Sequence, residues 1–263
     1  MPAYSLKQIK MSFEQKREWE KQFPLNFHIV RPLSFLFTFP IIRLTSSPSK
    51  VAWAGFFVGL AGCISFLRIS IWTGWPALLL ITVFSILDAV DGNIARTTGR
   101  ITYYGKFIDG SIGEVIEGSY CFFLGLGLTM HILSASHSSL DFHLSVHQAV
   151  YPLLSGTAIM AGRLYGSFLE LKYGYHFFEK QIDDNEVARI SVYDKIQTST
   201  FRGKWYYNVF INVNLLNNQI VCLALFLWLG KPAIFLYVLA PYYLIRLIIY
   251  FAFFVRRARI RLT

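Results

Sequence analysis

Residues 88–113 read DAVDGNIARTTGRITYYGKFIDGSIG and place three aspartates inside an otherwise apolar part of the chain. Asp88 and Asp91 close an apolar run that begins near residue 74, and Asp109 opens another that continues to about residue 133. A charged side chain at membrane depth costs about 2.5 kcal/mol or more, so such residues normally mark a functional site. The stretch therefore predicts two membrane helices that share a polar centre.

The composition of the whole chain agrees with a membrane protein. Of its 263 residues, 54% are hydrophobic and only 15% are charged, and the mean hydropathy is +0.45, which excludes an ordinary soluble domain. Apolar windows of about 20 residues recur, each long enough to cross the hydrocarbon core. The expected spans lie near 51–67, 74–95, 106–133, 148–171, 207–229 and 232–255. The predicted fold class is all-α: a polytopic membrane protein with a bundle of about six transmembrane helices.

The segments that flank the bundle differ from it in composition. Residues 1–50 interleave aromatic and aliphatic residues with Lys and Arg, which predicts a cytoplasmic N-terminal segment with an amphipathic helix at the membrane interface. Residues 51–255 are expected to form the six-helix domain, and residues 256–263, with four arginines, a basic cytoplasmic tail. The spacing of Gly55, Gly59 and Gly62 predicts close packing of the first span against a neighbouring helix.

The positive charge is distributed in a way that predicts topology. Lys and Arg gather before residue 50, around 96–106, between 180 and 204, and after 256, whereas the Ser134–His147 loop has neither. Because positive residues near helix ends are retained in the cytoplasm, we expect a multi-pass integral membrane protein with both termini cytoplasmic. The net charge of +10 is then explained by topology and anionic membrane lipids, and no nucleic-acid partner is expected.

The spacing of the aspartates predicts one site shared by two helices. Residues three apart lie on the same helix face, so Asp88 and Asp91 project together near the end of their span. The next span runs the other way from Gly105, which places Asp109 level with that pair. Three carboxylates without nitrogen or sulfur ligands favour Mg²⁺ or Mn²⁺, which commonly joins carboxylates to substrate phosphates.

The same stretch resembles the signature of the CDP-alcohol phosphotransferases. That family reads Asp-x2-Asp-Gly-x2-Ala-Arg-x8-Gly-x3-Asp-x3-Asp, and this sequence matches seven of the eight defining positions, with Gly113 in place of the last Asp. The resemblance implies that Asp88, Asp91 and Asp109 bind the metal. It further implies that the CDP moiety is bound by Gly92, Ala95, Arg96 and Gly105.

The resemblance also implies a reaction. A phosphatidyl or substituted phosphate group would pass from a CDP-linked lipid donor, for which CDP-diacylglycerol is expected, to an alcohol acceptor, with release of CMP. The resemblance suggests a homodimer. Alternatives from other classes are a catalytically silent relative that binds a CDP-linked lipid or a partner protein, and a transporter that uses the acidic cluster as an ion site.

Gly113 leaves the catalytic base to be found, because the family's last Asp is thought to deprotonate the attacking hydroxyl. Relative to Asp109, Glu117 is rotated by about 80° and lies about 12 Å deeper, whereas Glu114 is rotated by about 140° but lies closer in depth. Both are therefore candidate replacements for the catalytic base.

Two arginines in the later spans are candidates for the acceptor site. Arg163 and Arg246 are expected in the halves of their spans nearest the aspartates, where either could bind a phosphate on the acceptor. The alternative is that they form structural ion pairs with Glu170, or with Glu114 and Glu117.

Overall fold

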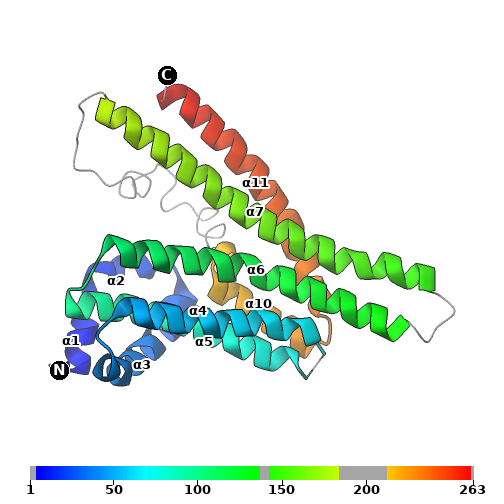
Figure 1. Ribbon diagram of the computed structural model, residues 1–263, viewed down its shortest axis with the longest axis horizontal. Coiled ribbons are helices and arrows are strands. Elements are labelled where there is room, and N and C mark those ends of the chain that lie inside the picture. The colour runs from blue at the N-terminus through cyan, green and yellow to red at the C-terminus, as the bar shows by residue number, and fades with distance from the viewer. Residues whose placement is uncertain (1–3, 71, 137–141, 184–211, 262–263) are drawn as a thin grey trace.

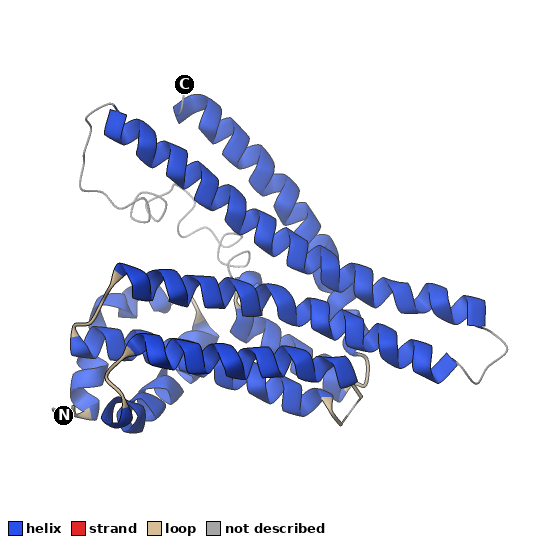
Figure 2. Cartoon of the chain, in the orientation of Figure 1, coloured by secondary structure: helices blue, strands red, loops and turns tan. Residues whose placement is uncertain are grey.

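The computed structural model describes residues 4–70, 72–136, 142–183 and 212–261, and every element within these ranges is helical. Figure 2 shows this all-helical arrangement. The predicted all-α class is confirmed. Five of the described helices are long and apolar enough to cross a membrane, and the chain is therefore described as an integral membrane protein.

The N-terminal segment folds into short helices. They are α1 (Leu6–Met11), α2 (Glu14–Glu20), the π-helix η1 (Asn26–Val30) and α3 (Arg31–Leu44). The first begins at a capping box, in which the Ser5 hydroxyl accepts from the Gln8 N–H and the Gln8 side chain accepts from the Ser5 N–H. Residues Asn26–Leu44 also have the length and composition of a membrane span. The interfacial placement of this segment stays a prediction.

The next three predicted spans coincide with helices. They are α4 (Pro48–Ser65), which continues into the 3₁₀ turn η2 (Phe66–Arg68), α5 (Gly74–Thr98) and α6 (Tyr103–Ser136). Pro48 at the first turn suits a helix start, because no N–H is needed there. Gly99 has a φ of 68° and ends α5, a backbone conformation that favours glycine. This turn reverses the chain and sends α6 back alongside α5.

The last part of the chain departs from the predicted pattern of spans. It contains α7 (Phe142–Asp183), α10 (Leu216–Trp228) and α11 (Pro232–Arg261). The predicted span 232–255 lies within α11, which has the length and hydropathy of a span. Helix α7 contains 148–171 but is 42 residues long and is not among the five apolar spans, and polar residues such as Arg163 and Glu170 interrupt it. Helix α10, which lies in the predicted span 207–229, has 13 residues and is too short to cross a membrane. Residues 207–211 of this predicted span lie outside the described ranges.

Figure 1 shows how these helices are arranged. Helices α4, α5 and α6 lie side by side, and α7 and α11 run together on the far side of α6. One end of the bundle holds the N-terminus and the α5–α6 connection, and toward that end α7 and α11 diverge from α6. The α4–α5 connection lies at the opposite end of the bundle. Both described chain ends are thus on the side of the α5–α6 connection. The assignment of that side to the cytoplasm stays a prediction.

The core lies where α4, α5, α6, α10 and α11 meet. Phe84, Ile116, Leu124, Leu223 and Phe235 are among its buried side chains. The outer faces carry exposed apolar residues instead, as expected for helices that face lipid. The bundle therefore presents apolar residues both to its core and to its surroundings.

Small residues bring the helices close together at several crossings. A Cβ at Gly59 would lie 3.0 Å from Phe84 and Ile116, and one at Gly62 would lie 2.9 Å from Ile81, so the predicted packing role of this glycine run is confirmed. Helices α6 and α7 approach even more closely, since a Cβ at Gly125 would overlap the Pro152 carbonyl oxygen.

This close approach gives a testable difference between two glycines of α6. Gly125→Ala is expected to destabilise the protein by about 1–3 kcal/mol, because the added methyl meets backbone that cannot rotate away. Gly110→Ala is the matched control, since a Cβ there meets no atom within 4 Å and alanine favours the helix. Thermal unfolding in detergent should show a lower midpoint for the first variant only. Equal unfolding midpoints for the two variants would contradict the close approach of α6 and α7 at Gly125.

Candidate functional site

The three aspartates predicted to share a site do come together between α5 and α6. The Asp88 and Asp109 carboxyl groups lie within hydrogen-bonding distance of each other, and Asp91 interacts electrostatically with both. Asp91 is buried, with 4% of its surface exposed, whereas Asp88 and Asp109 remain accessible. A ligand can therefore reach two of the carboxylates, while the third lies beneath them.

The donor type of this cluster suits a hard divalent cation, but its present arrangement does not ligate one. Within the described ranges, no three His, Cys, Asp or Glu side chains are placed to hold a metal ion. The cluster nevertheless consists of carboxylates from two helices with no competing nitrogen or sulfur ligand, the donor set that Mg²⁺ and Mn²⁺ prefer. The metal-binding roles of the aspartates stay predictions.

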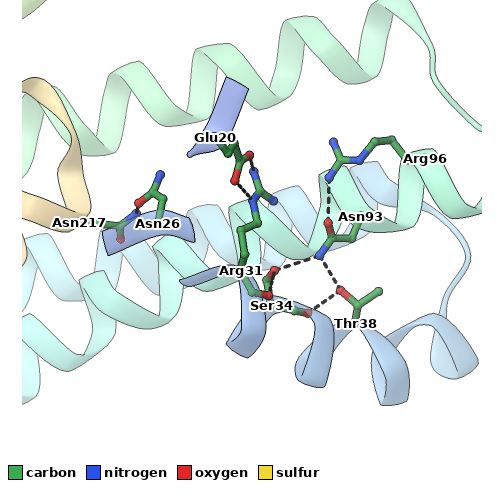
Figure 3. Close-up of polar contacts among 8 residues, drawn as sticks. All are labelled: Glu20, Asn26, Arg31, Ser34, Thr38, Asn93, Arg96 and Asn217. Atoms are coloured by element: carbon green, nitrogen blue, oxygen red, sulfur yellow. Dashed lines mark hydrogen bonds and ion pairs between the residues drawn. The ribbon is translucent and has the colours of Figure 1, made fainter. Parts of the chain in front are cut away.

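A buried hydrogen-bond network places Arg96 beside the aspartates. The Arg96 guanidinium donates to Asn93 Oδ1 at 2.8 Å, and the fully buried Asn93 amide donates to Ser34 Oγ at 3.0 Å and to Thr38 Oγ1 at 3.2 Å on α3. Figure 3 shows this chain of contacts from α3 through Asn93 to Arg96. Asn93 is a site residue that the motif did not indicate. The one feature of the sequence that could have pointed to it is a polar amide side chain at the end of an apolar run.

The small residues of the motif differ in what they do. A Cβ at Gly92 would lie 3.3 Å from Arg96 Nη1, so glycine leaves room for the guanidinium to lie back along α5. Gly105 donates its N–H to Thr102 Oγ1 at 2.9 Å and thereby caps the start of α6, and Ala95 is half-buried on α5. Their predicted contacts with a CDP moiety stay predictions.

Gly113, the departure from the family pattern, faces open space. A Cβ built at this position meets no atom within 4 Å. A Cβ at this position is therefore accommodated without a clash with the described residues.

Glu117, one of the two candidate bases, is held in an ion pair. Its carboxylate forms an ion pair with Arg163 of α7, and Arg163 also donates to Tyr243 Oη at 3.0 Å and to the Asn214 carbonyl at 3.2 Å. Gln219 donates to the same Tyr243 hydroxyl at 2.8 Å and accepts from Tyr120 at 2.6 Å. This network joins α6, α7, α10 and α11, which matches the alternative in which Arg163 is a structural partner. The ion pair engages Glu117 Oε2 and holds the carboxylate toward α7.

Glu114 and Arg246 lie in a second charged group. Glu170 of α7 interacts electrostatically with Arg246 and with Glu114. The Arg246 guanidinium lies over the Tyr250 ring at 4.6 Å, and its buried Nε has no hydrogen-bond partner. The aspartates and Arg96 thus form one group, whereas Glu114 and Glu117 are turned toward α7.

Comparison with known proteins agrees with the motif. Residues 36–146 match the family model of the CDP-alcohol phosphatidyltransferases. An archaetidylinositol phosphate synthase of Pyrococcus horikoshii is 32% identical over 88 residues, which cover 33% of this chain and 45% of that protein. A phosphatidylinositol phosphate synthase of Cutibacterium acnes is 32% identical over 90 residues, or 34% of this chain and 41% of that protein.

The match to these proteins is partial. The chain spans less than half the length of the curated relatives that it matches first, and no solved structure matches it at comparable significance. The family match nevertheless contains the whole motif from Asp88 to Asp109 and the helices that carry it. Residues 36–146 of this chain, which carry the aspartate motif, are therefore the part that matches the CDP-alcohol phosphatidyltransferase family.

Proposed function

We propose that this protein is a membrane transferase of phospholipid biosynthesis. It moves a phosphatidyl or substituted phosphate group from a CDP-linked donor, CDP-diacylglycerol, to an alcohol acceptor and releases CMP. The observation that supports this most directly is the convergence of Asp88, Asp91 and Asp109 beside Arg96, within the part of the chain that matches the family.

In the proposed reaction the acceptor hydroxyl oxygen attacks the phosphorus that carries the transferred group. A new phosphorus–oxygen bond forms, the bond to the CMP phosphate breaks, and CMP leaves with that electron pair. Mg²⁺ or Mn²⁺ held by Asp88, Asp91 and Asp109 would neutralise charge on the phosphates. Arg96 donates hydrogen bonds to phosphate oxygens, and Asn93 holds Arg96 in place.

The proton of the acceptor hydroxyl needs a base that Gly113 cannot provide. Glu114 and Glu117 are the proposed replacements. Glu114 is preferred, because within the described ranges it forms no hydrogen bond or ion pair, whereas Glu117 is paired with Arg163. The Glu114 side chain would have to turn toward the aspartates to act, since a base must reach the proton that it takes.

The relatives suggest which acceptor to test first. Because they are named archaetidylinositol and phosphatidylinositol phosphate synthases, we propose an inositol phosphate as the acceptor. Arg246 is the proposed phosphate contact, since one of its nitrogens is buried without a partner. Arg163 remains a weaker candidate because the Glu117 pair occupies it. Homodimer formation and cytoplasmic termini are further parts of this proposal.

A second candidate function follows from Gly113 alone. A relative that has lost its base could bind a CDP-linked lipid, or present it to a partner protein, without turning it over. This version keeps the metal and nucleotide residues and predicts binding without CMP release.

The transferase proposal is tested by CMP release from CDP-diacylglycerol. Purified protein with Mg²⁺ or Mn²⁺ and inositol phosphate is expected to release CMP at a rate that depends on both metal and acceptor. Glycerol phosphate, inositol and serine serve as competing acceptors. CDP binding without CMP release from any acceptor would support the silent relative instead, and absence of cytidine nucleotide binding would contradict both candidates.

A further inference from the structure

Two cations from the N-terminal segment lie near the aspartate site, although they precede the family match. Lys16 of α2 interacts electrostatically with Arg96 and Asp109, and Arg31 at the start of α3 interacts with Asp88 and Arg96. The family match begins at residue 36. These two residues therefore lie outside the matched part of the chain, whereas the motif lies on α5 and α6.

Hydrogen bonds between distant segments hold these cations in place. The Ser12 and Thr97 hydroxyls lie 3.1 Å apart and join the start of the chain to the end of α5. Asn93 ties α5 to Ser34 and Thr38 of α3. The helices that carry Lys16 and Arg31 are thus anchored on the same end of α5 that carries the aspartates and Arg96.

Arg31 is oriented by a buried carboxylate. Glu20 has 1% of its surface exposed and accepts from Arg31 Nε at 2.5 Å and from Nη2. The guanidinium also lies 5.0 Å from the Phe13 ring centroid. This pairing uses one edge of the guanidinium and leaves Nη1 free. Figure 3 shows Arg31 extending from α3 to Glu20 and the Arg96 guanidinium lying over Asn93.

Both guanidinium groups contain a buried nitrogen that lacks a partner. Among the residues that the structure describes, Arg31 Nη1 and Arg96 Nε are buried and have no hydrogen-bond partner. Buried donors are normally satisfied, so two such nitrogens beside one site call for an acceptor that is absent when no ligand is bound. Arginine donors of this kind suit phosphate oxygens.

The charges around the site favour an anion as well. Desolvation by the surrounding protein, followed by the neighbouring Arg96 and Arg31 charges, lowers the pKa of the Lys16 ammonium below its ordinary value. Three cations are held together here, and within the described ranges Arg31 alone among them forms an ion pair with a carboxylate. Once a divalent cation occupies the aspartates, Lys16 and Arg96 lose the carboxylates that balance them. A phosphate-bearing ligand would restore that balance.

We propose that Lys16 and Arg31 bind the pyrophosphate of the CDP-linked donor and, with Arg96, form the wall of the site opposite the aspartates. Glu20 is a positioning residue that orients Arg31. This inference rests on the proposed function and adds two donor contacts outside the family motif. The same cations could bind the phosphate of an anionic lipid headgroup, so the test separates these two sources.

The test measures CDP affinity by calorimetry, with Mn²⁺ present and the full chain in phosphatidylcholine nanodiscs. Lys16→Gln and the double variant Glu20→Gln/Arg31→Gln are each expected to weaken CDP binding about tenfold, the effect of one charge-assisted hydrogen bond. The double variant removes both charges of the buried pair, so neither is left without its partner. Lys10→Gln is the matched control, because Lys10 is exposed on α1 and has the same charge. Its affinity should stay within twofold of wild type.

The possible outcomes are distinguishable. If wild type binds CDP and all variants bind it equally, Lys16 and Arg31 are not donor contacts, while the proposed function stands. If the variants lose only binding to phosphatidylglycerol in mixed nanodiscs, the cations contact lipid headgroups and the inference is overturned. Failure of wild type to bind CDP would overturn both proposals. Lys16 keeps much of its side-chain surface exposed although its ammonium is partly desolvated, so its variant remains informative even if the double variant unfolds.

Discussion

Asp91→Ala is expected to reduce CMP release by at least about 10³-fold, the largest loss of any single change in this chain. Asp91 is the most buried of the three aspartates and interacts with both of the others. Its removal takes one carboxylate from the proposed metal site, and charge stabilisation by a metal contributes several kcal/mol to phosphoryl transfer. The rate of CMP formation from CDP-diacylglycerol, measured under single-turnover conditions, tests this.

Two comparisons separate lost chemistry from lost folding. Asp91→Asn keeps the size of the side chain but not its charge, and it should lose activity to a similar extent while unfolding near the wild-type temperature. Glu18→Ala changes an exposed carboxylate on α2 and should retain full activity. A chelator should abolish the wild-type rate, and Mg²⁺ or Mn²⁺ should restore it. An Asp91→Ala variant with more than a tenth of wild-type activity would contradict the assignment of this residue.

Gly113→Asp is expected to raise kcat about 10²-fold, the largest gain. A Cβ at this position meets open space, so the carboxylate can enter without a clash. Position 113 lies about 40° around the helix from Asp109 and about 6 Å along it, so the new side chain faces the same region. A positioned general base contributes about 10²–10⁴-fold, and the lower end applies because Glu114 already serves this role in our proposal. Initial rates at saturating donor and acceptor measure the change.

The matched control for this gain is Gly113→Asn, which has the same shape but cannot accept the proton as a carboxylate does. It should leave kcat at or below the wild-type value. A fall in kcat with Gly113→Asp would mean that the wild-type site is adapted to glycine and takes the proton by another route. A strong gain from a wild-type rate near zero would instead favour the silent relative, with the base as its missing part.

Local sequence patterns were sufficient to predict most of the long helices and the aspartate part of the site. Hydropathy predicted α4, α5, α6 and α11, because a helix that crosses lipid needs a predominantly apolar run of about 20 residues. The three-residue spacing of Asp88 and Asp91, with one reversal before Asp109, predicted their convergence. Hydropathy did not predict that α10 would be short or that α7 would extend over 42 residues. These lengths depend on helix packing and on polar residues that find partners inside the bundle.

The pairing of distant charges was not predictable in the same way. Arg163 could have paired with Glu170, Glu114 or Glu117, and the structure pairs it with Glu117. Nothing in the first fifty residues indicated that Lys16 and Arg31 would face the aspartates, since they belong to short helices whose placement depends on contacts with α5. Asn93 is 59 residues from its partner Ser34, and Glu20 is 11 residues from its partner Arg31. Neither separation carries a periodic signal of the contact.

The sequence by itself thus determined the membrane class, the positions of the main helices and the aspartate cluster, because each depends on hydrophobicity or on spacing along one or two adjacent helices. The tertiary structure alone decided which carboxylates are paired, which glycines touch backbone and which cations surround the site. Those contacts depend on how each helix is rotated and tilted against the others. That rotation and tilt are set by packing across the whole bundle, which no local pattern in the sequence records.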